Sequence, residues 1–130
     1  MNEMALTVSL VMLTIGNFLG GMWANESWGR YWGWDPKETW ALISIMIYAF
    51  VIHMRLIPGL RSRFVFSVAS VLAYGSIMMT YFGVNFYLAG LHSYAKDDQE
   101  ISINYIVATL ISLTFISILA YRKHKKYFLN

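Results

Sequence analysis

The chain contains no cysteine among its 130 residues, and it has few charges. The first absence excludes a disulfide, a thiolate metal site and a cysteine nucleophile, so any chemistry must use histidine, carboxylates, aromatic rings or a cofactor. Charged residues make up 13% of the chain against 58% hydrophobic residues. This balance lies outside the composition of ordinary soluble domains and indicates a membrane as the solvent.

The small excess of positive charge does not indicate a nucleic-acid-binding protein. Ten Lys and Arg against seven Asp and Glu give a net charge of +3. These basic residues flank apolar runs and do not form one patch, which nucleic-acid binding would need. The first apolar run follows the acidic Glu3 and lacks the basic start of a signal peptide, so we interpret it as a retained helix.

Four apolar stretches are long enough to cross a bilayer. A helix of about 20 residues spans ~30 Å of hydrocarbon. The sequence therefore predicts an all-α fold, an integral membrane four-helix bundle that forms one unit over residues 1–130. The predicted spans are residues 4–22, 39–56, 64–82 and 101–121. The predicted connections are residues 23–38, 57–63 and 83–100, followed by a basic tail.

The basic residues also predict the orientation in the membrane. Four spans place both termini on the same side. If that side is the cytoplasm, seven basic residues lie inside and three outside, as the positive-inside rule requires. The inside residues are Arg55, Arg61, Arg63, Arg122, Lys123, Lys125 and Lys126, and the outside residues are Arg30, Lys37 and Lys96. We therefore expect cytoplasmic termini and two outer loops that carry the function.

All the tryptophans of the chain fall within residues 23–40, which we call the tryptophan-rich segment. They are Trp23, Trp28, Trp32, Trp34 and Trp40. One interpretation is an aromatic belt at the membrane interface, where indole rings favour headgroup depth. However, Gly29 and Gly33 interrupt the segment, and glycines suit close backbone turns that present ring faces to a flat ligand. A belt has no need of such glycines.

The tetrapeptide that follows has a structural explanation of its own. Asp35 can act as the N-cap of the second helix, Pro36 suits the first helical position, and Glu38 completes a capping box. The cap would fix how the tryptophan-rich segment sits on the helix. We therefore predict that these carboxylates orient the segment and do not transfer protons.

The run WGRYWGWDPKETWAL resembles the WWD signature of cytochrome c biogenesis proteins, and DPKETWAL is similar to the CcsA/ResC branch in particular. The related CcmC and CcmF proteins follow their Asp with different residues. A second stretch, TYFGVNFYLAGLHSY at residues 80–94, resembles the segment after the next span in the same branch. The resemblance covers nearly all of this chain but only the C-terminal part of a usual family member.

Two histidines gain a role from this resemblance. Taken alone, His53 inside a span marks a functional position or a satisfied interhelical hydrogen bond, and His92 is equally readable as a solvated loop residue. The resemblance implies that both are haem iron ligands. It also implies a haem surface made by Trp23, Trp28, Trp32, Trp34, Trp40 and Asp35. Arg30 or Lys37 would pair with a haem propionate, whereas His124 receives no role.

The function that the resemblance implies is assembly of c-type cytochromes by a System II complex, a holocytochrome c synthase or haem lyase. Haem b, as substrate and ligand, would pass His53 and be held at the outer face by His92. The Cys-x-x-Cys-His segment of apocytochrome c would then dock there, and its own thiols would add to the haem. Catalysis by this chain would consist mainly of positioning.

The same resemblance implies partners. The family uses two further histidines upstream, which this chain does not match, so we expect it to be incomplete alone and to work with the missing N-terminal part and a ResB/CcsB-like membrane partner. The expected location is the bacterial cytoplasmic (inner) membrane, with the thylakoid membrane as the alternative. Both place the active face outside.

Three other functions stay open at this point. The first is a haem exporter or delivery subunit without ligase activity. The second is a non-haem structural membrane subunit whose tryptophans only anchor it at the interface. The third is a small quinone or ion carrier that uses His53 as a proton relay.

Overall fold

The computed structural model describes residues 2–88 and 103–128, and within them every regular element is helical. The elements are α1 (Asn2–Trp28), α2 (Pro36–His53), the 3₁₀ turn η1 (Met54–Leu56), α3 (Arg63–Met78), the π-helical turn η2 (Met79–Gly83), α4 (Val84–Tyr87) and α5 (Ile103–Phe128). Four helical stretches are long and apolar enough to cross a membrane. The prediction of an all-α membrane fold with four spans is therefore confirmed.

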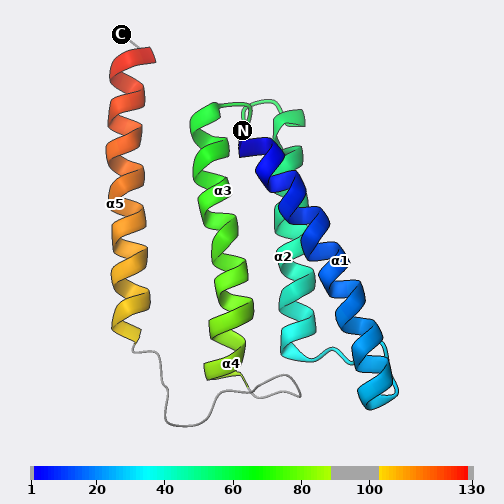
Figure 1. Cartoon of the computed structure of the whole chain (residues 1–130). Helices are drawn as coiled ribbons and strands as arrows, with labels where there is room; N and C mark the ends of the chain where they lie inside the picture. Colours follow the sequence, from blue (N-terminus) through cyan, green and yellow to red (C-terminus); the bar gives the residue numbers. More distant parts are fainter. Residues whose placement is uncertain (1, 89–102, 129–130) are drawn as a thin grey trace. The chain divides into compact units, whose positions relative to one another are not determined.

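The helices α1 to α4 belong to one compact unit, and α5 belongs to another. In the first unit α2 is central, because α1 and α3 both pack against it (Figure 1). One end of this unit holds the loop of residues 29–35, the start of α2 and α4, and we call it the tryptophan end. The other end holds the start of α1, η1 and the turn into α3, and we call it the arginine end.

Several helices are longer than the apolar runs that predicted them. The first continues past residue 22 to Trp28, the third continues through η2 and α4 to Tyr87, and the last continues past residue 121 to Phe128. Hydropathy marks where side chains become polar, but backbone hydrogen bonds continue a helix regardless of side-chain polarity. The predicted first loop, residues 23–38, is therefore reduced to residues 29–35.

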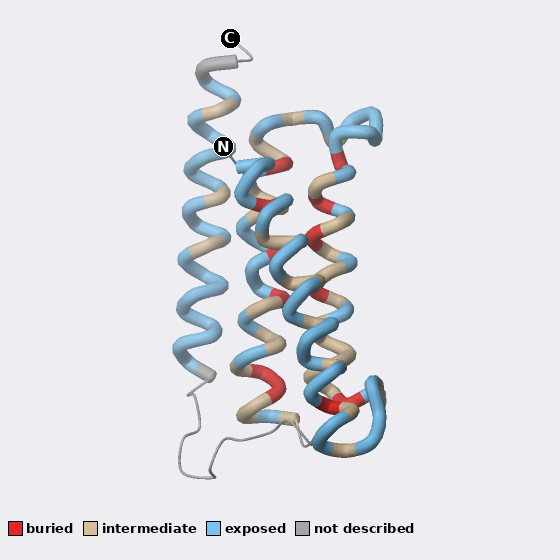
Figure 2. The backbone as a smooth tube through the Cα atoms, turned by 45° about the vertical axis from the view of Figure 1, so that its right-hand side comes forward, coloured by how far each residue is buried: buried red, intermediate tan, exposed pale blue. Residues whose placement is uncertain are grey.

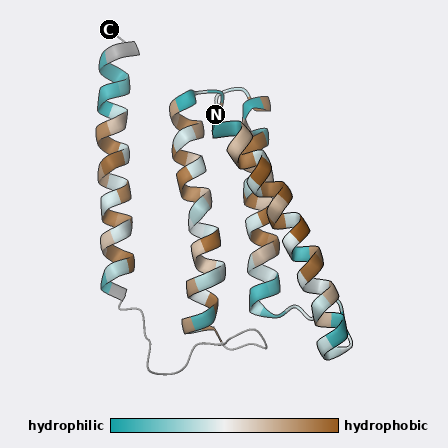
Figure 3. Ribbon diagram, in the orientation of Figure 1, coloured by the Kyte–Doolittle hydropathy of each residue, from teal (hydrophilic) through white to brown (hydrophobic). Residues whose placement is uncertain are grey.

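The core of the first unit lies along the faces where α1, α2 and α3 meet (Figure 2). Its buried residues are Leu6, Tyr48, Val51, Met54, Phe66 and Ala73. Large apolar side chains on the outer faces, such as Val8, Phe18 and Phe50, are exposed. Figure 3 shows hydrophilic residues at the start of α2 and at the ends of α3 and α5. Apolar outer faces between polar ends suit helices surrounded by lipid.

A polar contact joins α2 to the π-helical turn inside this apolar unit. The Oγ of Ser44, which is 1% exposed, lies 3.1 Å from the Oγ1 of Thr80. Each hydroxyl also lies within hydrogen-bond distance of its own helix, at the carbonyls of Trp40 and Ser76. The two hydroxyls have only two protons for these three contacts. One hydroxyl therefore donates to the other across the interface, and the second donates to a carbonyl of its own helix. The contact fixes the register of η2 against α2.

The end of α1 is set by Gly29, whose backbone has a φ of +69° while its N–H donates to the Asn25 carbonyl at 2.8 Å. A side chain disfavours this left-handed conformation, so Gly29→Ala should lower the free energy of unfolding by about 1 kcal/mol. Gly29→Asn should lose less, because asparagine tolerates the conformation. The measurement is the thermal unfolding midpoint of the helical circular dichroism signal in detergent.

Gly16→Ala is the matched control for this measurement. Gly16 lies inside α1, and a Cβ there would meet nothing within 4 Å. This variant should raise the midpoint, because alanine stabilises a helix interior relative to glycine by roughly 0.5–1 kcal/mol. Equal destabilisation by both alanines would contradict the assignment of Gly29 as a left-handed helix terminus.

Candidate functional site

The tryptophan-rich segment divides between two helix ends and the loop of residues 29–35. Trp23 and Trp28 lie on the last turns of α1 with their ring centroids 5.0 Å apart and edge to face. Trp32 and Trp34 lie in the loop with centroids 5.8 Å apart, also edge to face. Trp40 lies half-buried on the first turns of α2. The segment thus forms two rigid aromatic pairs, a geometry that the ring quadrupoles favour.

Trp34 has an unusual backbone conformation for a bulky residue. Its φ is +55°, and the residue is 72% exposed. A non-glycine residue in the left-handed region is uncommon, and such strain persists only where the surrounding structure holds it. No pattern in the sequence predicted this backbone conformation. The indole of Trp34 is therefore a large exposed aromatic side chain at the tryptophan end, and Tyr31 in the same loop is also exposed.

Glu38 holds this loop in place. Its Oε2 accepts hydrogen bonds from the Gly33 N–H at 2.7 Å and from the Asp35 N–H at 3.2 Å. The Asp35 carboxylate in turn accepts from the Lys37 N–H at 3.3 Å and completes a capping box at the start of α2. The predicted capping box is confirmed. The contact with Gly33 extends it, so one carboxylate organises both the helix start and the loop before it.

Close backbone approaches also depend on two glycines. A Cβ on Gly33 would lie 2.6 Å from the Cζ of Arg30, so the guanidinium of Arg30 lies directly over this glycine. A Cβ on Gly21 would lie 3.2 Å from the carbonyl oxygen of Tyr31, which shows that the loop folds back on α1. Arg30 is exposed and so presents a cation beside the aromatic pairs.

A second link at this end was not predicted. The Nζ of Lys37 donates to the Oδ1 of Asn85 at 3.1 Å, which joins the start of α2 to α4. The sequence carried one signal that could have found it, because Asn85 is a polar residue in an otherwise apolar and aromatic stretch. The bond holds the chain segment leading into the second predicted outer loop beside the tryptophan-rich segment.

His53 is the last residue of α2 and lies at the arginine end. Its Nδ1 lies 2.7 Å from the Ala49 carbonyl oxygen. A carbonyl only accepts hydrogen bonds, so Nδ1 carries a proton, and in the tautomer that this bond selects the lone pair is on Nε2. Metal-binding histidines show this arrangement, in which one nitrogen donates to the protein and the other binds the metal. The ring is exposed.

The structure does not bring His53 to the tryptophan-rich segment. Eighteen residues of helix separate the two ends of α2, a rise of about 27 Å. A single flat ligand cannot contact both. The other predicted ligand, His92, lies outside the described residues. Within residues 2–88 and 103–128, no three His, Asp or Glu side chains gather as they would around a structural metal ion.

Comparisons with known proteins identify the family of this chain. A family model for cytochrome C assembly protein matches residues 1–92. Protein NrfI of Wolinella succinogenes is 63% identical over 97 residues, which are 75% of this chain and 11% of that protein. Cytochrome c biogenesis protein CcsA is 51% identical in a Synechococcus strain and 48% in Cyanophora paradoxa, over 64% and 68% of this chain.

The four spans and these relatives define a multi-pass membrane protein. The chain belongs to the cytochrome c assembly protein family. It spans between 11% and 27% of the length of the three relatives described here.

The fluorescence of the chain tests the role of Glu38, because all its tryptophans lie in one segment. Glu38→Ala removes the acceptor for two backbone N–H groups and should lower the free energy of unfolding by about 1–2 kcal/mol. It should also make the indoles easier to quench with acrylamide. Glu26→Ala, at an exposed glutamate of α1, should leave quenching unchanged. Equal quenching in both variants would refute the organising role.

The link between Lys37 and Asn85 is tested by a double-mutant cycle. Lys37→Met and Asn85→Leu each remove one partner and conserve volume approximately. Unfolding of the two single variants and the double variant should give a coupling free energy of about 1 kcal/mol, as expected for a partly buried hydrogen bond to a charged group. Additive effects would show that the two side chains do not interact in solution.

Proposed function

We propose that this chain binds haem and presents it at the outer face of the membrane for covalent attachment to apocytochrome c. The observation that carries the proposal is the tryptophan end. There an open aromatic surface, a capped helix start and the exposed cation of Arg30 come together. Porphyrin is flat and apolar with two carboxylates on one edge, so aromatic faces beside a cation match its chemistry.

The position of Asn85 supports His92 as an axial ligand at this surface. Asn85 is hydrogen-bonded to Lys37 at the tryptophan end. The last described residue there is Leu88, four residues before His92 in the sequence. Four residues of chain reach at most about 14 Å. The proposal therefore assigns His92 to the tryptophan end.

His53 serves a separate step in the proposal. It lies about 27 Å along α2 from the loop, and its Nε2 lone pair suits haem iron. We assign it to haem entering from the membrane or the cytoplasmic side, before the haem reaches the outer surface. A histidine at the opposite end of α2 from the tryptophan-rich segment fits transfer across the bilayer better than one shared site.

The chemistry of attachment then belongs to the partners. The apocytochrome supplies the thiols of its Cys-x-x-Cys-His segment, and each thiol adds across one haem vinyl group. A ResB/CcsB-like membrane protein and further histidines of the family fold complete the complex in this proposal. The residues of this chain hold and orient the haem, which lowers the barrier by positioning.

The test is the absorption spectrum of the detergent-purified chain with added haem. A Soret band should appear, His92→Gly should change it, and added imidazole should restore it by replacing the missing ligand. A change in the His53→Gly spectrum that the His92→Gly variant does not share would support two sites. The proposal that this chain binds haem is refuted if no Soret band appears, even when the rest of a family member is co-expressed.

A haem delivery subunit without ligase activity is the second candidate, since the same surface would serve it. A covalent haem stain of a reporter cytochrome separates the two. Covalent haem on the reporter that depends on Trp34 and His92 supports presentation for attachment. Haem binding without any covalent product in the complete complex supports delivery alone.

A further inference from the structure

The arginine end carries a groove that is separate from the proposed haem surface at the tryptophan end. It is lined by Ile52, His53, Arg55, Leu56 and Arg61 and has a volume of about 520 Å³. Volumes of about 300–1,000 Å³ are usual for small-molecule sites. One wall is apolar, one residue is an imidazole with its Nε2 lone pair available, and two residues are guanidinium groups. This combination of side chains matches a flat, apolar ligand that carries a metal ion and two anionic groups.

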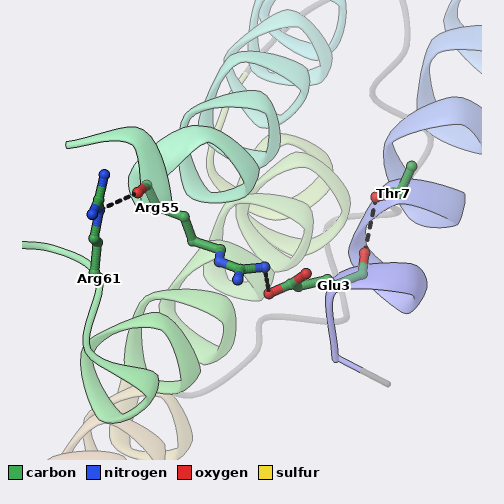
Figure 4. Close-up of polar contacts among 4 residues, drawn as sticks. All are labelled: Glu3, Thr7, Arg55 and Arg61. Carbon is green, nitrogen blue, oxygen red and sulfur yellow. Dashed lines mark hydrogen bonds and ion pairs between the residues drawn. The ribbon is translucent and has the colours of Figure 1, made fainter.

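The groove has a fixed geometry. The Arg61 Nε donates to the Arg55 carbonyl at 3.1 Å (Figure 4). Backbone hydrogen bonds from the Ile57 N–H to the Met54 carbonyl and from the Leu60 N–H to the Ile57 carbonyl close the turn between them. Arg61 uses one of its N–H donors in this bond, and its terminal nitrogens offer further donors. The position of one arginine relative to the other is therefore set by the chain.

Arg55 already binds a carboxylate. Its Nη1 forms an ion pair with the Oε1 of Glu3 at the start of α1, and both side chains are more than half exposed (Figure 4). This contact shows that the Arg55 guanidinium is accessible to a carboxylate. The described residues at this end include three arginines, at positions 55, 61 and 63, against the single acid Glu3. The surplus of positive charge favours another anion.

We propose that Arg55 and Arg61 bind the two propionates of a haem that is ligated by His53. This proposal rests on the haem-binding function proposed above. It adds a basis for ligand specificity, because the groove would select a porphyrin that carries two carboxylates. Glu3 competes for Arg55 in the empty groove and yields it to the propionate. The two arginines position the haem edge toward the cytoplasmic headgroups while the porphyrin lies against Ile52 and Leu56.

The experiment uses the purified full chain in detergent, in the His92→Gly background, so that His53 is the ligand observed. Haem and its dimethyl ester, in which both propionates are neutral, are titrated and followed by absorption. Arg55→Gln and Arg61→Gln should each weaken haem binding about fivefold, which corresponds to the upper range for an exposed ion pair. Neither variant should change binding of the ester.

Two controls separate this role from a structural one. Arg63→Gln removes the same charge from the same end but does not line the groove, and it should leave haem affinity unchanged. Glu3→Gln removes the competing carboxylate and should tighten haem binding. If the ion pair only supported the fold, Glu3→Gln and Arg55→Gln would weaken binding together.

The outcomes distinguish this inference from the proposed function. One outcome is that haem binds through His53 with an affinity that is the same in all arginine variants and the same for its dimethyl ester. That result would overturn the propionate site and leave the proposed function standing. If no variant binds haem, both the propionate site and the proposed function are refuted. Loss of bound phosphatidylglycerol in Arg55→Gln and Arg61→Gln with unchanged haem affinity would show an anionic lipid site instead and overturn the inference.

Discussion

The hydrogen bonds at the start of α2 are the constraint on which the tryptophan end depends. In a bilayer every backbone polar group needs a partner within the protein, so a helix start beside the membrane must be capped. Asp35 caps the helix, and Glu38 binds the N–H groups of Gly33 and Asp35. Because Glu38 holds the backbone on the loop side as well, the cap also determines where Trp32 and Trp34 lie.

The second constraint is the length of α2. It is one straight element between two polar ends, and it carries the capped loop at one end and His53 at the other. A rise of about 27 Å makes these two separate sites. The contact of Ser44 with Thr80 and the bond of Lys37 to Asn85 tie η2 and α4 to the same helix. The two ends are therefore held at a constant separation on one helix, and the proposed transfer of haem between them depends on this separation.

The sequence predicted the parts whose causes are local. Apolar runs of about 20 residues predict spans because the bilayer has a fixed thickness, and the Asp-Pro-Lys-Glu order predicts a capping box because those side chains reach only their own helix start. It did not predict that α1 ends at Trp28, six residues beyond the apolar run, because backbone hydrogen bonding sets that boundary. Nor did it predict the positive φ of Trp34, which follows from how the loop is held.

The sequence by itself determined the class of the fold, the number of spans, the cap at Asp35 and the family to which two motifs point, since these depend on composition and on neighbours a few residues apart. Only the tertiary structure decided that Asn85 meets Lys37, that Thr80 meets Ser44, and that Glu3 meets Arg55. These contacts join residues whose proximity depends on how the helices pack, so no local pattern specifies them.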